Sequence, residues 1–212
     1  MGSTEEERGR GGTLYFAYGS NLSPTQMHSR CPLSTPIGLA HLPGWKWIIN
    51  KRGYANIVQC QTTSPTPTLA SQMNVSGNDD SEKNVEAIFT GREGAYGVLY
   101  RLHPDDEATL DACEGVPWAY ERRFLDVTLA RSPASTITTI DEVEDNVIFQ
   151  DTEQAQTACV LVYIDFKRDS PGIPKGEYIG RMNRGIQEAM TDWGLPKSYV
   201  DAVMRPFIPG TQ

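Results

Sequence analysis

The sequence lacks the features that mark metal centres, disulfide scaffolds and membrane proteins. Its 4 cysteines are widely spaced, with no Cys-x-x-Cys pair, and its 3 histidines show no ligand spacing. Neither a zinc site nor a dense disulfide framework is therefore expected. No apolar run approaches the ~20 residues of a membrane-spanning helix. We expect no metal, no cofactor, no membrane partner, and free thiols in a reducing compartment.

Positive charge is also scarce. Lys and Arg number 19 against 27 Asp and Glu, which gives a net charge of −8. Nucleic acid binding needs clustered Lys and Arg, so the balance argues against a nucleic acid partner. An anionic small molecule is not excluded, because a local site can oppose the global sign. The sequence has no pattern that fixes the oligomeric state, and a homodimer is left open.

The first residues, MGSTEEERGRGG, contain no apolar signal core. This favours a cytoplasmic location, with residues 1–12 as a disordered tail. The remainder, 13–212, is long enough for one domain with a substantial core. Two segments are expected to be insertions in this domain. Residues 61–84 are rich in Ser, Thr, Pro and Asn, and residues 131–156 contain 6 acidic residues. Either insertion could be a lid over a site or a surface decoration.

Short runs rich in β-branched and aromatic residues predict strands, and apolar positions at helical spacing predict helices. Ser23, Pro24 and Gln26 have the pattern of a helix start with a capping box. Many strands with few helices predict an α+β fold, a small mixed β-barrel or curled antiparallel sheet with flanking helices. The expected strands are 13–19, 45–50, 55–60, 85–89, 95–102, 120–130 and 158–166, and the expected helices are 21–31, 103–115, 176–194 and 196–209.

The stretch LYFAYGSNLSPTQM, residues 14–27, runs from a strand through Gly19 into a helix start. Such a turn leaves backbone N–H groups unpaired at a helix N-terminus, and glycine lets a ligand approach the backbone closely. Together they favour a carboxylate or phosphate ligand. A turn of this kind can equally be a plain connector between a strand and a helix.

Glu114 lies where a predicted helix is about to end, beside Gly115. A negative charge at a helix C-terminus is opposed by the helix dipole. The same opposition, combined with burial, would raise the pKa of Glu114 towards the range useful for a general base or acid. The alternative is an ordinary surface carboxylate at a helix end.

These two segments resemble the γ-glutamylcyclotransferase family. The matching residues are LYFAYGSNL at 14–22 and Leu110-Asp111-x-x-Glu114-Gly115-Val116. The segments GLAHLPGWKW and AYGVLYRL stand where the family has its second strand and the strand before the catalytic segment. The likeness covers about two thirds of the chain and is weakest over the two insertions. It implies a γ-glutamylcyclotransferase-like fold and an enzyme without cofactor.

The activity that the resemblance implies is a lyase-type ring closure. A γ-glutamyl substrate would form 5-oxoproline and release an amino acid, a peptide or a thiol conjugate. Glu114 would be the catalytic general base and acid, and Tyr178, in a loose Pro-x-x-x-Tyr match, would contact substrate. Tyr178 could instead be an ordinary amphipathic-helix residue, and Tyr120 is a candidate neighbour of the site. The other implied substrate-binding residues are Tyr15, Phe16, Ala17, Tyr18, Gly19, Ser20 and Asn21.

Two other functions compete with this one. The same fold could serve a binding module for amino-acid-like ligands, or a relative specific for γ-glutamylamines. Some relatives act on glutathione conjugates in toxin biosynthesis, so glutathione and its conjugates are candidate substrates alongside γ-glutamyl dipeptides. The identity of the leaving group is not encoded in any motif of the sequence.

Overall fold

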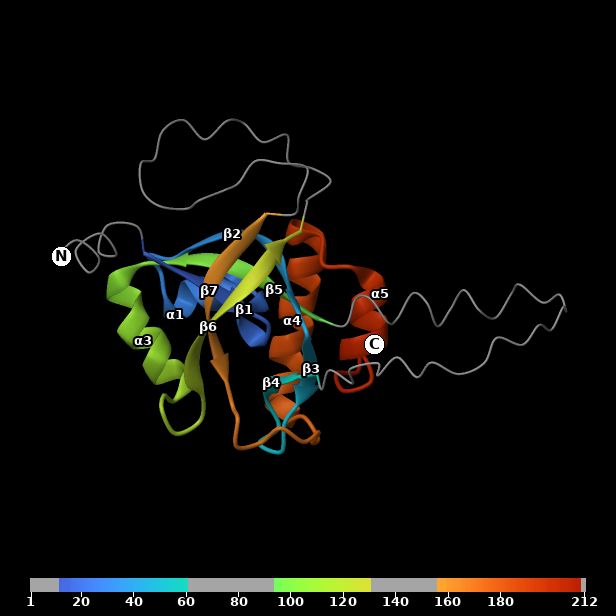
Figure 1. Cartoon of the computed structure of the whole chain (residues 1–212). Coiled ribbons are helices and arrows are strands. Elements are labelled where there is room, and N and C mark those ends of the chain that lie inside the picture. The colour runs from blue at the N-terminus through green and yellow to red at the C-terminus, as the bar shows by residue number, and fades with distance from the viewer. Residues whose placement is uncertain (1–11, 61–93, 131–155, 211–212) are drawn as a thin grey trace, which may run out of the picture.

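The computed structural model describes residues 12–60, 94–130 and 156–210 (Figure 1). The predicted tail, except Gly12, and the two predicted insertions, except Gln156, lie outside these ranges. The predicted strand at 85–89 also lies outside them.

A closed barrel of five strands, ordered β1-β5-β2-β6-β7, forms the centre of the described part of the chain. The β1–β7 pairing is parallel and the other pairings are antiparallel. This arrangement confirms the predicted α+β class and the small mixed barrel. Strands β3 and β4 form a separate two-stranded sheet. The strands are β1 Thr13–Ala17, β2 Thr35–Pro43, β3 Trp45–Ile49, β4 Ala55–Gln59, β5 Gly94–Leu102, β6 Glu121–Leu129 and β7 Thr157–Ile164.

Strand β2 was not predicted from composition. It contains Pro36, Gly38 and Pro43, which are poor strand formers. It nevertheless pairs with β5 along most of its length and with β6 at Ala40 and His41. The family resemblance placed one strand over 38–47. The structure instead turns at Gly44, where φ is +75°, and the chain passes into β3 of the other sheet.

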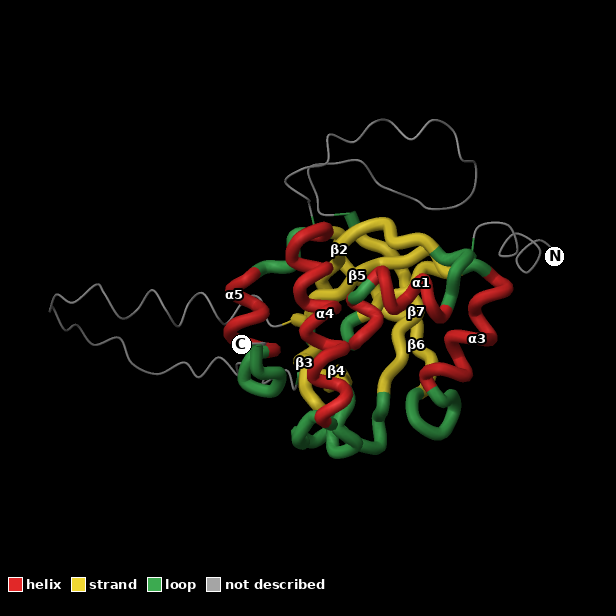
Figure 2. The backbone as a smooth tube through the Cα atoms, turned by 180° about the vertical axis from the view of Figure 1, so that it is seen from behind, coloured by secondary structure: helices red, strands yellow, loops and turns green. Residues whose placement is uncertain are grey.

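Helices α3, Pro104–Glu114, and α4, Gly176–Trp193, match the predicted helices closely. Both end at a glycine in the left-handed conformation, Gly115 and Gly194, as expected for a C-terminal stop. Figures 1 and 2 show α3 on one side of the barrel and α4 on the opposite side. The C-terminal segment predicted as one helix is α5, Lys197–Tyr199, followed by a π-helical turn at Val200–Met204.

The first predicted helix is shorter than expected. A 3₁₀ turn at Ser20–Leu22 comes first, and α1 then runs over Pro24–Arg30. The Ser23 hydroxyl accepts a hydrogen bond from the Gln26 backbone N–H at 3.0 Å, so the predicted N-cap is confirmed. The reciprocal half of the capping box is wrong. The Gln26 side-chain amide instead donates to Ser20 and Asn21, because it lies beside the 3₁₀ turn.

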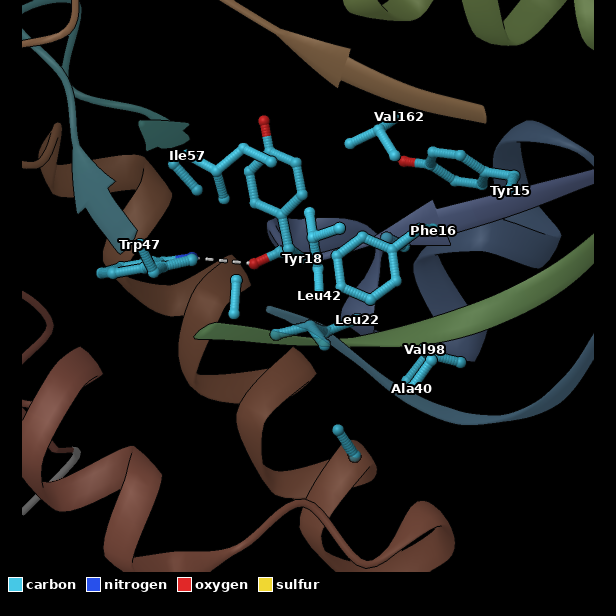
Figure 3. Packing of buried hydrophobic residues seen from close by; sticks show 14 of the residues in the cluster. Tyr15, Phe16, Tyr18, Leu22, Ala40, Leu42, Trp47, Ile57, Val98 and Val162 are labelled. Carbon is cyan, nitrogen blue, oxygen red and sulfur yellow. Dashed lines mark hydrogen bonds between the residues drawn. The ribbon is translucent and has the colours of Figure 1, made fainter. Parts of the chain in front are cut away.

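The core holds the segment that leads into Gly19. The Phe16 ring packs with Leu22, Leu42 and neighbouring apolar side chains (Figure 3). The indole N–H of Trp47 donates a hydrogen bond to the Tyr18 carbonyl at 2.9 Å, which ties β3 to the end of β1 (Figure 3). Burying a large apolar side chain stabilises a fold by about 1.5–3 kcal/mol. The backbone before Gly19 is therefore held in place by packing.

Two further observations bear on the sequence predictions. None of the 4 cysteines, all of which lie in the described ranges, forms a disulfide bond. No helix in those ranges is long and apolar enough to cross a membrane.

Candidate active site

A cavity of about 210 Å³ lies where the end of β1 meets the C-terminus of α3, the β3–β4 turn and the first turns of α4. Most of its wall is polar, and tyrosine and arginine side chains dominate it. A concave site with a few converging polar groups is the usual form of a small-molecule site. The lining residues are Tyr15, Tyr18, Gly19, Ser20, Asn21, Arg30, Arg52, Tyr54, Ala55, Cys113, Glu114, Tyr120, Tyr163, Tyr178 and Arg181.

Glu114 is the acidic residue of this lining. It is the last residue of α3, and Gly115 ends the helix directly after it with φ at +67°. The Asn21 side-chain amide donates a hydrogen bond to Glu114 Oε1 at 3.1 Å. Arg30 Nη1 lies 3.9 Å from the same oxygen, and the Glu114 side chain is 17% exposed. The carboxylate therefore meets the 3₁₀ turn after β1, which contains Asn21.

The environment raises the pKa of Glu114 above its ordinary value. Burial is the main cause, because it penalises the charged carboxylate. The positive charges of Arg30 and Arg181, the hydrogen bond from Asn21, and the charge of Arg52 lower the pKa and oppose burial. The net direction moves the pKa of Glu114 towards the range in which a carboxyl group can both accept and release a proton.

The backbone beside Gly19 is held by a tyrosine. The Tyr178 hydroxyl oxygen accepts hydrogen bonds from the backbone N–H of Ser20 at 3.2 Å and of Ala55 at 3.3 Å. A Cβ atom at Gly19 would lie only 3.0 Å from that hydroxyl. Glycine is thus required here by close approach, since its φ of −104° is an ordinary value.

The structure corrects the prediction of an anion site at the N-terminus of the first helix. The start of α1 already has a carboxylate partner. Glu188 accepts hydrogen bonds from the Ser23 hydroxyl at 2.7 Å and the Thr25 backbone N–H at 3.1 Å. Backbone N–H groups near Gly19 and Ser20 were expected to face a ligand, but the N–H of Ser20 is bonded to Tyr178. The cavity is therefore built around the 3₁₀ turn and not around the α1 N-terminus.

Burial keeps several tyrosines of the cavity neutral, as hydrogen-bonding groups. Burial raises the pKa of Tyr178 to about 12, and burial likewise raises the pKa of Tyr15, Tyr18 and Tyr120. The Tyr15 hydroxyl accepts a hydrogen bond from Asn21 at 3.1 Å. The Tyr120 hydroxyl donates to the Ala55 carbonyl at 2.8 Å. These bonds fix the ring positions around Glu114.

Three arginines give the cavity a positive lining. Arg30 Nη1 donates to the Asn21 side-chain oxygen at 3.0 Å. Arg181 is bonded through all three of its nitrogens, to Gln26, Glu177 and the Ser20 hydroxyl. Arg52 comes from the β3–β4 turn. With Glu114 as the single acidic side chain of the lining, the cavity suits an anionic ligand even though the whole chain is acidic.

The described residues contain no group of three or more His, Cys, Asp or Glu side chains that could hold a metal ion.

Comparison with solved structures places this arrangement among known folds. A structure named gamma-glutamyl cyclotransferase matches with a TM-score of 0.58 and 18% identity, over 94% of this chain and 89% of that chain. The chain has the γ-glutamylcyclotransferase-like fold. An uncharacterized protein from Homo sapiens matches with a TM-score of 0.58 and 19% identity, over 94% of this chain and 89% of that chain.

A third neighbour with the γ-glutamylcyclotransferase-like fold is longer than this chain. YkqA from Bacillus subtilis matches with a TM-score of 0.55 and 16% identity, over 94% of this chain but 56% of YkqA. No protein-family model matches the sequence, and a search of curated proteins found no match. At these identities the likeness establishes the fold, and the activity has to be argued from the cavity.

Within this fold, the structure brings most of the predicted site residues together and leaves two out. Phe16 and Ala17 are fully buried and do not line the cavity. Both side chains belong to the core, and the place of this backbone segment in substrate binding stays a prediction. The predicted residues that line the cavity are Tyr15, Tyr18, Gly19, Ser20, Asn21, Glu114, Tyr120 and Tyr178.

The three arginines that line the cavity were not predicted from the sequence. Arg181 lies three residues after Tyr178 on α4, so helical spacing could have placed it on the same face. Arg30 ends α1, and Arg52 lies in a turn, where no periodic signal exists. Tyr163 on β7 also lines the cavity, and its hydroxyl donates to Asp111 at 2.7 Å. These residues come together only through the tertiary fold.

Proposed function

We propose that this cavity binds a γ-glutamyl group and catalyses its cyclisation to 5-oxoproline, with release of an amine. The observation that carries the proposal is the position of Glu114. Its carboxylate lines the same cavity as Gly19 and Ser20, accepts a hydrogen bond from Asn21, and has a raised pKa. A proton carrier in this position is needed for the ring closure and is not needed by a simple binding site.

The reaction requires proton transfers and no redox change. The substrate's α-amine is mainly an ammonium ion at neutral pH, so its nitrogen loses one proton before it attacks and a second one as the ring closes. The substrate's α-amine attacks its own γ-carbonyl carbon, a C–N bond closes the five-membered ring, and the amide C–N bond to the leaving amine breaks. Glu114 takes the proton from the attacking amine and passes it to the leaving nitrogen. Because the attack is intramolecular, holding the glutamyl chain in a folded shape supplies much of the acceleration.

Tyr178 is the group proposed to face the developing oxyanion. Its oxygen accepts two backbone N–H bonds, and the described residues provide no acceptor for its own proton. Two donors on the oxygen strengthen the hydroxyl as a donor in turn. A hydroxyl held in this way is suited to stabilising negative charge on the substrate's carbonyl oxygen. In this proposal the Tyr178 hydroxyl stabilises the oxyanion, a role that the backbone N–H groups near Gly19 and Ser20 were expected to share.

The positive lining supports a substrate that carries carboxylate. The α-carboxylate of a γ-glutamyl group sits on the same carbon as the attacking amine. Once that amine lies at Glu114, the α-carboxylate lies close to Arg30, whose Nη1 is 3.9 Å from Glu114 Oε1. A charge-assisted contact with Arg30 would orient the amine towards Glu114.

The proposal is tested with a panel of γ-glutamyl compounds and detection of 5-oxoproline by mass spectrometry. The panel contains γ-glutamylalanine, glutathione, a bulky thioether conjugate of glutathione, and ε-(γ-glutamyl)lysine. Formation of 5-oxoproline from at least one of the first three supports the proposal. Turnover of ε-(γ-glutamyl)lysine alone would indicate a γ-glutamylamine cyclotransferase. Binding of these compounds with no turnover would indicate a binding module.

A further inference from the structure

Arg52 differs from the other two arginines of the cavity in its hydrogen bonding. Arg30 and Arg181 both donate to neighbouring side chains. No acceptor in the described ranges forms a hydrogen bond with the Arg52 guanidinium, and its Nη1 atom is buried without a partner. The side chain is 30% exposed and lines the cavity. Nη1 faces Asp165, so the N–H groups that are left for a partner in the cavity are the other ones of this partly exposed guanidinium.

The nearest carboxylate of the protein does not fill that role. Asp165 Oδ2 is 3.9 Å from Arg52 Nη1, beyond hydrogen-bond distance. Asp165 is almost fully buried and already has closer partners. Arg168 Nη1 lies 3.0 Å and 3.2 Å from its two oxygens, and Asn50 donates to Oδ2 at 3.0 Å. Asp165 therefore fixes one edge of the guanidinium electrostatically and leaves its other N–H groups unused.

The position of Arg52 is rigid. Asn50, which is fully buried, accepts hydrogen bonds from the backbone N–H of Arg52 at 3.0 Å and of Tyr54 at 3.3 Å. The guanidinium carbon lies 5.5 Å from the ring centre of Tyr54 and 5.4 Å from that of Tyr120. Cation–π contacts of this kind hold an arginine without using its N–H groups. A planar donor fixed in this way matches a carboxylate.

We propose that Arg52 recognises a carboxylate on the leaving group and thereby sets the substrate preference of the cavity. The inference rests on the proposed function. The α-carboxylate of the glutamyl group is assigned to Arg30, which lies beside Glu114. Arg52 comes from the β3–β4 turn, which is a different part of the cavity wall. Of the three arginines, it lowers the pKa of Glu114 least. It is therefore available for the far end of the substrate. Leaving groups that carry a carboxylate are favoured over neutral amines and amides.

The test compares γ-glutamylalanine with γ-glutamylalaninamide, which differ only in the carboxylate of the leaving group. For the wild-type chain we expect kcat/KM to be about tenfold to a hundredfold higher for the acid, as for one charge-assisted contact. Arg52→Gln should lose that preference, chiefly through a higher KM for the acid, so that kcat/KM becomes nearly equal for the acid and the amide. Arg52→Lys should restore part of the preference, because it keeps the charge but not the planar donor.

Arg184→Gln is the matched control, since Arg184 is exposed on α4 and lies outside the cavity lining. It should leave the preference unchanged. Equal turnover of the acid and the amide by the wild type would overturn the proposal. So would an Arg52→Gln variant that loses the same factor on both substrates, which would indicate a structural role.

A binding experiment tests this inference independently of the proposed function. Isothermal titration of Glu114→Gln with both compounds, with and without Arg52→Gln, measures recognition without turnover. Tighter binding of the acid that disappears with Arg52→Gln supports the inference even if no 5-oxoproline is formed and the proposed activity fails. Equal affinity for the two compounds overturns the inference even if 5-oxoproline is formed.

Discussion

The side-chain amide of Asn21 donates a hydrogen bond to Glu114 Oε1 at 3.1 Å, across 93 positions of sequence. This bond joins the 3₁₀ turn after β1 to the last residue of α3. It ties the two segments that a γ-glutamyl substrate would have to bridge. The bond also stabilises the charged form of Glu114 against the effect of burial.

Replacement of Asn21 by Ala removes this bond and should raise the pKa of Glu114 further. Glu114 must be ionised to accept a proton, so kcat/KM falls as the pH drops through its pKa. For the wild type, this acid limb should lie above 4.5, the ordinary glutamate value. In Asn21→Ala it should move to still higher pH. The pH dependence of kcat/KM measures both positions.

Gln187→Ala is the control for this shift, because Gln187 is exposed on α4 and donates only to Thr191. It should leave the acid limb where it is in the wild type. An acid limb that stays in place in Asn21→Ala, or moves to lower pH, would remove Asn21 from the control of Glu114.

Tyr178→Phe deletes the hydroxyl that accepts the N–H bonds of Ser20 and Ala55. Two buried donors lose their acceptor, and the free energy of unfolding should fall by about 1–3 kcal/mol. Loss of the oxyanion donor should also lower kcat by about 10²–10³. Chemical denaturation and steady-state kinetics measure the two effects. Tyr96→Phe, outside the cavity, should keep kcat. A Tyr178→Phe enzyme with wild-type kcat would exclude the hydroxyl from the reaction.

Gly19→Ala tests the close approach of Tyr178 to the backbone. The added Cβ would lie 3.0 Å from the Tyr178 hydroxyl and 3.4 Å from the Ala55 Cβ. The added methyl group would occupy space in the cavity that Gly19 lines and should raise KM by about tenfold, equivalent to about 1.4 kcal/mol. Displacement of the Tyr178 hydroxyl should also lower kcat, and Gly19→Val should raise KM further. Gly180→Ala is the control, since its Cβ meets nothing within 4 Å. It should leave KM unchanged and stabilise α4 by about 0.5–1 kcal/mol. An unchanged KM in both Gly19 variants would refute the role given to this backbone.

Local sequence signals were sufficient for much of the fold. Helix α3 has Pro104 at its start and Gly115 at its end, and α4 has a regular apolar face, so each helix is specified by its own residues. Strand β2 could not be predicted in this way. Its Pro and Gly residues oppose strand formation, and only pairing with β5 and β6 makes it a strand.

The candidate site likewise contains residues that local sequence signals predict and residues that only the tertiary fold brings together. Gly19 and Glu114 were predicted because each lies at a recognisable element boundary and because the family resemblance linked them. Phe16 and Ala17 were included with the motif, but their side chains lie in the core and outside the cavity lining, because a motif does not say which side chains face the core. Arg52 was missed, because its role depends on Asn50, Tyr54 and Tyr120 and not on any pattern around it.

The most direct test of the account is the rate of 5-oxoproline formation by Glu114→Gln. The side chain keeps its length and can still accept from Asn21, but it cannot take a proton. We expect turnover to fall by about 10²–10⁴ while affinity for the substrate is retained. Glu121→Gln, which removes an exposed carboxylate outside the cavity, should keep wild-type turnover. Turnover by Glu114→Gln within about threefold of wild type, well short of a lost general base, would contradict the account.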